Sequence, residues 1–545
     1  MSNTGNKCWL PYCPDFLRRL LALIHFVRLS LMKGAHADLS STAWQEIGVK
    51  PYFGLSGMPQ HSTRLFFVKR GSRGIATRII PFPCRSNEFL LSSGRQSTQV
   101  GGKPQIIPCM RQRTTTESRD VVDGYDERYW RFLTDKQREA GTEFVMGKRE
   151  GSYIWNLEGD RRILECGNSG GVHSLGHRNP EIIRALQDAV GYLDAGLWSM
   201  PTAEHLALQD AFAASTPVPS ICRSVATLSS TCSIDLALLF SFRVTGRRKA
   251  LAYRHGYHGH GGFAALVTGS EIEGIFGHYP VPEQHSEFFE SYGCLESVEE
   301  NLKKRECASV ILETFNYETF APAPPSYLPE LAHLCRKYGT LLIIDETRTG
   351  LSRSGKFWMS SHYDFTPDML ILGKGLGGGI YPASAVLTSE AIYDFCMNST
   401  KWGYMSSMAI SPIGALVACK VVEIAQRSSL LENVSRLQSA IGDSFAALCA
   451  RYPDVYFPGS VLGGIATLGV QDQAAAEAIK RELFQRNVLC HSVSAISPYV
   501  VKFFPCLTSD PSIAGEIAGA LEDFALQQRR TPSSVMATTL GAGER

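Results

Sequence analysis

Between about residue 120 and residue 530, the chain alternates short apolar runs with longer segments in which apolar residues recur every three to four positions. A short, fully apolar run is typical of a strand buried on both faces of a parallel sheet, and the periodic segments predict amphipathic helices. Strands that alternate with helices in this way indicate βαβ units and an α/β fold. The expected strands cover 225–228, 249–253, 308–313, 341–345 and 369–372, and the expected helices include 180–193, 233–244 and 329–338.

The pattern differs at the two ends of this region. Residues 151–165 alternate between apolar and polar positions around the turn Glu158-Gly159-Asp160, which predicts a β-hairpin. After Pro412, two long helical patterns are followed by shorter helices and strands, which indicates a separate, smaller α+β domain. The expected elements of that domain are helices 413–426, 431–450, 474–485 and 513–526 and strands 463–470 and 500–504.

These changes in pattern also predict the domain boundaries. The segments are a basic extension that is poorly ordered or carries a targeting signal (1–120), an N-terminal segment contributing to the small domain (121–200), a large cofactor-binding domain (201–412), a C-terminal small domain (413–530) and a disordered tail (531–545). Residues 16–33 hold four basic residues and no acid in an amphipathic pattern, as mitochondrial transit peptides do. The alternative is a poorly ordered extension or a wrongly assigned translation start. We therefore expect the cytoplasm or the mitochondrial matrix as the compartment.

Composition narrows the class of protein further. The formal net charge of +2 favours neither a nucleic-acid nor a membrane partner, although residues 1–120 hold 17 Lys and Arg against 6 Asp and Glu. No run of 18 uncharged apolar residues is present, so no transmembrane span is expected. The 15 cysteines include no CxxC pair and no zinc-ligand spacing, which is typical of a reducing compartment and predicts no metal site.

Two charged residues stand at the ends of buried strands. Asp345 ends the run Leu341-Leu342-Ile343-Ile344, and Lys374 follows the run 369–372 within a series of glycines. Open α/β sheets bind ligands at the carboxyl ends of their strands, so both side chains are expected at one edge of the sheet. A buried aspartate and a lysine are the groups that pyridoxal phosphate requires, as the partner of the ring nitrogen and as the Schiff-base amine.

Two further motifs carry weaker signals. The run Ser229-Ser230-Thr231-Cys232 opens a predicted helix, where free N–H groups and hydroxyls suit a phosphate, although such runs also serve only as helix caps. Tyr257 lies in a glycine-rich loop with three nearby histidines and could stack on an aromatic cofactor. A metal site is not favoured there, because the loop contains no carboxylate.

Together these motifs resemble the class III, or ω-amino-acid, family of pyridoxal-phosphate-dependent aminotransferases of fold type I. The resemblance covers about 151–526, and its most specific parts are 342–358 and 367–382. It implies a large domain with a mostly parallel seven-stranded sheet, a smaller α+β domain, and a homodimer with shared active sites. It further implies the cofactor pyridoxal 5′-phosphate and the transfer of an amino group between an amino acid or amine and a keto acid or aldehyde.

The resemblance also implies roles for single residues. By motif, Lys374 resembles the Schiff-base lysine, Asp345 the partner of the ring nitrogen and Tyr257 the ring-stacking aromatic. Ser407 lies where a threonine of the family reaches the cofactor phosphate of the neighbouring subunit. The expected cofactor-binding residues are Ser230, Thr231, Tyr257, His258, Asp345, Arg348, Lys374 and Ser407, and the expected substrate residues are Trp198, Glu318, Arg348 and Lys502.

Several residues depart from the family pattern. Ser230 has a Cβ where the family has glycine, Tyr317 fills space that is usually open, and Thr347 replaces a valine under the ring. Arg348 replaces a glutamine near the phenolic oxygen of the cofactor, and Lys502 replaces an arginine, which binds carboxylates better. These changes indicate an unusual substrate or a weakened enzyme. The alternatives are a 1,2-aminomutase of the glutamate-semialdehyde type and a non-catalytic relative.

Overall fold

The computed structural model describes residues 117–196, 200–269, 285–399, 406–408, 411–491, 493 and 496–530. All of them belong to the unit Pro108–Arg545. The predicted targeting helix at 16–33, the tail at 531–545 and Trp198 lie outside the described residues. None of the described helices is long and apolar enough to cross a membrane.

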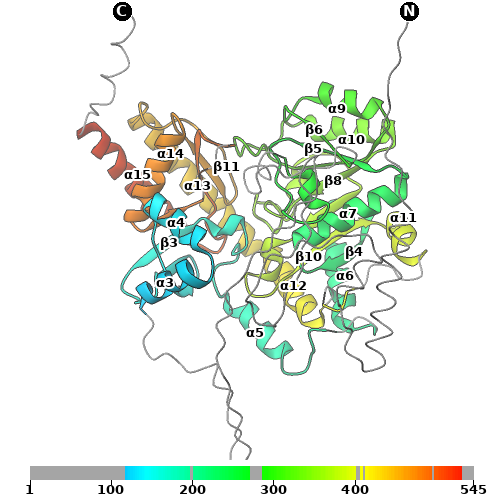
Figure 1. The fold of residues 1–545 in the computed structure, drawn as a ribbon, viewed down its shortest axis with the longest axis horizontal. Coiled ribbons are helices and arrows are strands. Elements are labelled where there is room, and N and C mark those ends of the chain that lie inside the picture. Colours follow the sequence, from blue (N-terminus) through cyan, green and yellow to red (C-terminus); the bar gives the residue numbers. More distant parts are fainter. Residues whose placement is uncertain are drawn as a thin grey trace, which may run out of the picture. The chain divides into compact units, whose positions relative to one another are not determined.

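A seven-stranded sheet forms the centre of the molecule (Figure 1). Only β10 runs antiparallel to its neighbours, so the predicted α/β class with a mostly parallel sheet is confirmed. In spatial order the strands are β4 (Ile221–Thr227), β10 (Ser384–Ser389), β9 (Met369–Leu372), β8 (Leu341–Asp345), β7 (Cys307–Glu313), β5 (Lys249–Tyr253) and β6 (Ser286–Phe289).

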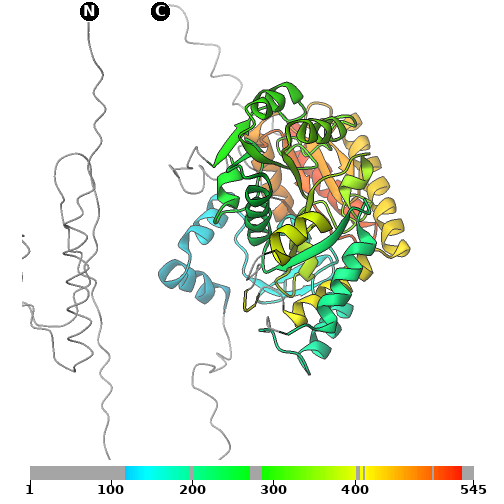
Figure 2. The ribbon, with the colours of Figure 1, turned by 90° about the vertical axis from the view of Figure 1, so that its right-hand side faces the viewer.

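Both faces of this sheet are covered by helices (Figure 2). Successive strand residues point to opposite faces, which is why the runs are apolar at every position. Ile343 packs in the apolar cluster that includes α7, whereas Leu342 and Ile344 pack in the cluster that includes α10 and α12. The helices around the sheet are α5 (Pro180–Ala189), α6 (Ala203–Ser215), α7 (Ser230–Thr245), α9 (Leu295–Lys303), α10 (Tyr327–Tyr338), α11 (Glu390–Tyr393) and α12 (Pro412–Ala425).

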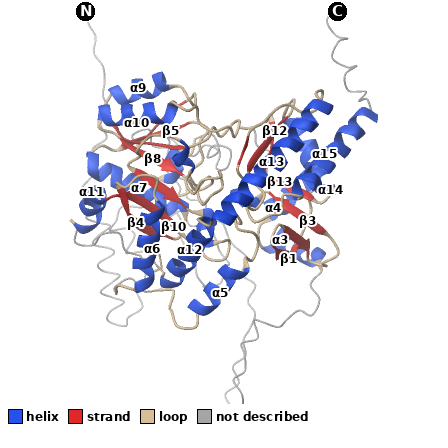
Figure 3. Cartoon of the chain, turned by 180° about the vertical axis from the view of Figure 1, so that it is seen from behind, coloured by secondary structure: helices blue, strands red, loops and turns tan. Residues whose placement is uncertain are grey.

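Two smaller sheets are built from both ends of the described chain (Figure 3). The predicted hairpin is confirmed as β2–β3, and β3 pairs in parallel with β13 from the C-terminal part. The first sheet contains β1 (Met146–Glu150), β2 (Tyr153–Asn156), β3 (Arg162–Cys166) and β13 (Val488–Cys490), and the second contains β11 (Val461–Leu462), β12 (Ile465–Gly469) and β14 (Val500–Phe503). The remaining helices are α3 (Ser118–Arg128), α4 (Arg131–Ala140), α13 (Ser428–Arg451), α14 (Gln473–Gln485) and α15 (Ile513–Arg530).

Local sequence signals explain where several helices begin. Asn179 caps α5 by accepting hydrogen bonds from the backbone N–H groups of Glu181 and Ile182 at 3.0 and 3.5 Å. Ser411 caps α12 in the same way, and Pro412 occupies the first helical position, where its missing N–H costs nothing. Ser229 caps α7, so the helix starts directly after the end of β4.

Candidate active site

The ends of β8 and β9 bring Asp345 and Lys374 to one edge of the central sheet. Asp345 is paired with Ile371 across the two parallel strands, and Lys374 follows three residues after that partner. The Lys374 amine donates a hydrogen bond to Thr347 Oγ1 at 3.3 Å. Lys374 has a φ of 45°, a left-handed conformation that is uncommon for a residue with a side chain and is most often found at functional sites.

The environment of Lys374 favours the neutral amine. Burial and the charge of Arg348 lower the pKa of Lys374 to about 8, against the opposing effects of Asp345 and Glu313. An ordinary lysine is almost entirely protonated at neutral pH and is therefore not a nucleophile. At this site a useful fraction of the amine is unprotonated near physiological pH.

Asp345 is held as a carboxylate by its surroundings. Its side chain is 1% exposed, and it accepts hydrogen bonds from His258 Nδ1 at 2.8 Å and from the Thr347 backbone N–H at 3.0 Å. Burial raises the pKa of Asp345, but the His258 hydrogen bond and the charges of His258 and Lys374 bring it below its ordinary value. His258 was expected to bind the cofactor, and in the structure its contact is with Asp345.

The start of α7 forms a pocket of hydroxyl groups next to Lys374. Ser230 and Thr231 are the first two residues of the helix, and both face glycines across the turn. A Cβ on Gly259 would lie 2.5 Å from Thr231 Oγ1, and a Cβ on Gly373 would lie closer than 3.0 Å to Ser230 Oγ. Glycine at both positions therefore leaves room for the Ser230 and Thr231 hydroxyls at the start of α7, and a helix N-terminus with such hydroxyls suits an anion.

A chain of buried hydroxyls fixes the start of α7 to the strand that leads to Lys374. Thr227 Oγ1 lies 2.7 Å from Ser233 Oγ, which lies 2.8 Å from Ser384 Oγ. Ser384 in turn donates a hydrogen bond to the backbone carbonyl of Leu372 at 2.5 Å. Sequence reasoning missed this chain of hydroxyls, because Thr227, Ser233 and Ser384 lie on three separate elements, β4, α7 and β10.

Arg348 lies in a buried cluster with Tyr317, another residue that departs from the family pattern. Its Nη2 donates a hydrogen bond to Tyr317 Oη at 3.1 Å, and its guanidinium lies 4.5 Å from the Tyr317 ring and 5.2 Å from the Tyr257 ring. Glu313 Oε1 lies 3.5 Å from Arg348 Nε and supplies the counter-charge. Burial raises the pKa of Glu313, and the charge of Arg348 opposes that rise.

The remaining predicted residues have different surroundings. Glu318 accepts a hydrogen bond from the Tyr253 hydroxyl. Lys502 is buried; its amine donates to Ser497 Oγ at 2.7 Å and lies 4.7 Å from the centre of the Phe320 ring. Ser407 is exposed, and among the described residues no hydrogen bond or ion pair joins it to Asp345 or Lys374.

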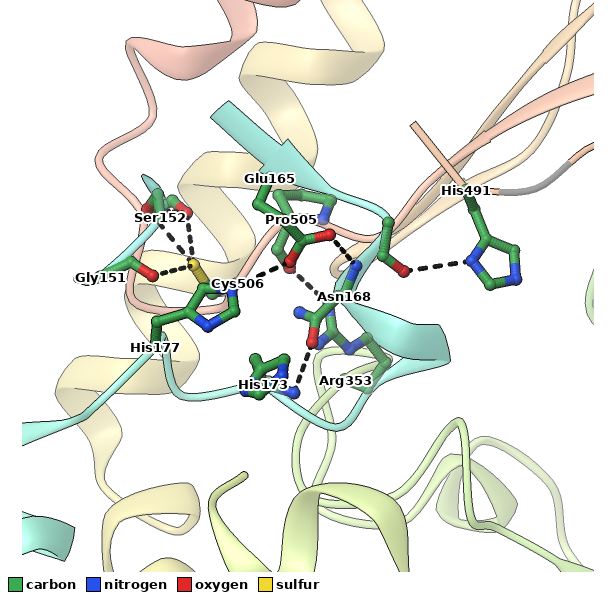
Figure 4. A network of polar contacts seen from close by, with 12 residues as sticks. Gly151, Ser152, Glu165, Asn168, His173, His177, Arg353, His491, Pro505 and Cys506 are labelled. Carbon is green, nitrogen blue, oxygen red and sulfur yellow. Dashed lines mark hydrogen bonds and ion pairs between the residues drawn. The ribbon is translucent and has the colours of Figure 1, made fainter. Parts of the chain in front are cut away.

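His491 joins the site although sequence reasoning did not select it. Its Nδ1 donates to the carbonyl of Gly167 at 3.1 Å (Figure 4). A Cβ on Gly170 would lie 3.7 Å from both His491 Cε1 and Lys374 Cε, so both side chains contact the turn Asn168–Gly170. Burial and the charges of Lys502, Arg348 and Lys374 lower the pKa of His491 to about 3, which keeps the ring neutral.

Comparison with known proteins identifies the family. The family model described as aminotransferase class-III matches residues 135–524. An uncharacterized aminotransferase of Archaeoglobus fulgidus is 35% identical over 57% of this chain and 72% of its own length. An acetylornithine aminotransferase of Rhodobacter capsulatus is 27% identical over 72% of this chain and 97% of its own length.

A solved structure supports the same fold. An S-selective transaminase from Arthrobacter sp. superimposes with a TM-score of 0.67 at 18% identity, over 76% of this chain and 99% of that one. At this level of identity the similarity establishes the fold alone, which is the predicted fold type I. With the family match over most of the described chain, the conclusion is that this protein belongs to the class III aminotransferases.

Proposed function

We propose that the protein binds pyridoxal 5′-phosphate through Lys374 and transfers an amino group from an amino acid or amine to a keto acid or aldehyde. The observation that carries this proposal is the placement of Lys374 and Asp345 at the ends of two adjacent strands, with an amine that is partly neutral near physiological pH. The cofactor supplies an electron sink for the carbon that loses a proton.

The residues present fit this cofactor. Asp345 would face the ring nitrogen, because its carboxylate is kept ionised by His258. Tyr257 and Thr347 would lie on the two faces of the ring, and Arg348 would face the phenolic oxygen. The N-terminus of α7, with Ser230 and Thr231, would receive the phosphate. Ser407 would complete the phosphate site of a neighbouring subunit in the homodimer that is typical of the family.

The side chains then divide the chemical work. The Nζ atom of Lys374, whose pKa is lowered, would accept the proton that leaves the substrate carbon and hold it for return. Lys502 and Arg348 supply positive charge for a substrate carboxylate, while Glu318 and Trp198 are proposed to line the substrate side. His491 is a neutral ring beside Lys374 and would line the site without repelling a positively or negatively charged substrate group.

An absorbance titration tests this proposal directly. Purified protein with added cofactor should show a bound-cofactor band, and amino donors from a panel of α-amino acids, ω-amino acids and diamines should bleach it. Lys374→Ala should lose both the band and turnover, whereas Lys356→Ala, at an exposed lysine outside the site, should keep both. Turnover in Lys374→Ala would contradict the proposal.

The comparisons offer no support for the aminomutase alternative. Dependence on an added keto-acid acceptor would separate the two reactions, because an aminomutase requires none. On the basis of the basic segment 16–33, we further propose that the enzyme works in the cytoplasm or the mitochondrial matrix.

A further inference from the structure

A second cavity lies apart from the residues that surround Lys374. It has a volume of about 650 Å³ and opens between β1, the loop 173–178 and the glycine turn at 379–380. Sites for small molecules typically measure about 300–1,000 Å³, so this volume is sufficient for a ligand. We call it the basic cavity, because the charged and titratable groups that line it are Lys148, Arg149, Glu150, His173, His177 and Arg178.

Positive charge is in excess in the basic cavity. Lys148 is already engaged, since its amine lies 2.5 Å from Glu150 Oε2 and 4.7 Å from the centre of the Trp155 ring. Arg149 and Arg178 are exposed, and neither lies within ion-pair distance of a carboxylate in the part of the chain that the structure describes. The only acid on the lining is thus neutralised by one cation, and two guanidinium groups are available to a ligand.

A buried carboxylate orients the histidine at the side of the cavity. His177 Nε2 donates to Glu165 Oε2 at 3.3 Å, and the His177 ring stacks on His173 with centroids 4.1 Å apart (Figure 4). The backbone of His177 is fixed as well, because it exchanges two hydrogen bonds with Gly151 at 2.8 and 3.0 Å. The Glu165 carboxylate and the two backbone hydrogen bonds therefore fix the orientation of His177 at the side of the cavity.

We propose that the basic cavity binds a phosphate-type oxyanion, with Arg149 and Arg178 as its principal ligands. A guanidinium forms bidentate hydrogen bonds with phosphate oxygens. The two positive charges of Arg149 and Arg178 match a dianion better than the single charge of a carboxylate. The phosphate can belong to the free inorganic ion or to a phosphorylated metabolite, and the recognition chemistry is the same for both.

The site is connected to the turn beside Lys374 through one side chain. Glu165 uses its second oxygen, Oε1, to accept a hydrogen bond from the Asn168 backbone N–H at 2.5 Å. Asn168 begins the turn whose Gly170 lies against Lys374. His177, on the lining of the cavity, is therefore two hydrogen bonds away from the backbone of the turn beside the reactive lysine.

Calorimetric titration of the full-length protein tests the proposal. The protein is first saturated with pyridoxal 5′-phosphate, so that phosphate cannot be taken up at the start of α7. Inorganic phosphate, pyrophosphate and glycerol 3-phosphate are then titrated separately. We expect saturable binding of one anion per chain, weakened at least about 10-fold by Arg149→Ala/Arg178→Ala. The free ion and the ester are distinguished by which of the three binds most tightly.

A matched control separates the cavity from general charge effects. Arg436→Ala/Arg481→Ala removes the same charge at two exposed arginines outside the cavity and should leave the affinity unchanged. Arg149→Lys/Arg178→Lys keeps the charge but loses the bidentate hydrogen bonds, and should weaken anion binding less than Arg149→Ala/Arg178→Ala does. No saturable binding below about 10 mM, or equal weakening in the alanine pair and its control, overturns the proposal.

Discussion

Replacing Gly373 by alanine should weaken cofactor binding by crowding Ser230. The backbone itself tolerates the change, because the φ of −172° at Gly373 is extended and open to any residue. The added Cβ, however, would lie closer than 3.0 Å to Ser230 Oγ, 3.1 Å from Ser384 Oγ and 3.2 Å from Ser230 Cβ. The Ser230 hydroxyl must therefore rotate away from its place at the start of α7, and even then its Cβ remains in tight contact.

The size of the effect follows from the cost of overpacking. Extra methyl groups in a well-packed region typically cost about 1–3 kcal/mol. If the start of α7 binds the phosphate, about 1.4 kcal/mol of that cost corresponds to a 10-fold loss in cofactor affinity. Absorbance titration of cofactor-free protein with pyridoxal 5′-phosphate measures this loss, and denaturant unfolding of the same samples measures any change in stability.

A double-mutant cycle identifies the cause. Ser230→Gly removes two of the three atoms that crowd the new methyl group, including the nearest one, so Ser230→Gly/Gly373→Ala should recover most of the lost affinity. Gly442→Ala is the matched control, because a Cβ there meets nothing within 4 Å. Unchanged affinity in Gly373→Ala, or a double variant no better than Gly373→Ala alone, would refute the steric argument.

Three further predictions concern the charged groups. The rate at which cofactor-free protein captures the cofactor should rise with pH around a midpoint near 8, because only the neutral Lys374 amine reacts. Arg348→Gln removes a charge that lowers the pKa of Lys374 and should therefore move this midpoint upward. Equal midpoints in stopped-flow absorbance measurements of the two proteins would contradict this prediction. Because the pKa of Lys374 is lower in the folded protein, the unfolded chain binds more protons between about pH 8 and 10.5. The free energy of unfolding of the cofactor-free protein should therefore rise over that pH range, and it should rise less in Lys374→Met. Urea unfolding at several pH values measures the difference. Asp345→Asn removes a carboxylate that accepts two hydrogen bonds. Since a hydrogen bond to a charged group is worth about 1.5–3 kcal/mol, kcat/KM should fall about 10- to 150-fold. A near-normal kcat/KM in steady-state assays would contradict the proposed role of Asp345.

The sequence predicted the parallel strands well because their physical signal is local. Strands β5, β7, β8 and β9 are largely buried on both faces, so most of their residues are apolar and the run is visible without knowledge of its neighbours. Strand β10 is equally buried but was not predicted. Its polar residues Ser384 and Thr388 resemble loop residues in the sequence, and only the structure supplies the carbonyls of Leu372 and Asp368 that satisfy them.

The residues of the candidate site also divide into those that a local sequence pattern predicts and those that only the folded structure reveals. Asp345 and Lys374 were predictable because each ends an apolar run, and the edge of a parallel sheet brings strand ends together. The contact of His258 with Asp345 was not predictable from spacing, since the two residues are 87 positions apart and His258 lies in a loop without periodicity. His491 gave no signal at all, because its place beside Lys374 depends on the pairing of β13 with β3.

The departures from the family pattern do not resemble the independent losses of a decaying enzyme. Tyr317 and Arg348 contact each other by a hydrogen bond and by stacking, with Glu313 as the counter-charge, so these two departures form one packed unit. Ser230 likewise fits only because residue 373 has no side chain. Without a function, a lysine at position 374 with a left-handed backbone and a depressed pKa would be a cost that simple substitution could remove. The mutual adjustment of these residues therefore favours a reshaped substrate site over a lost one.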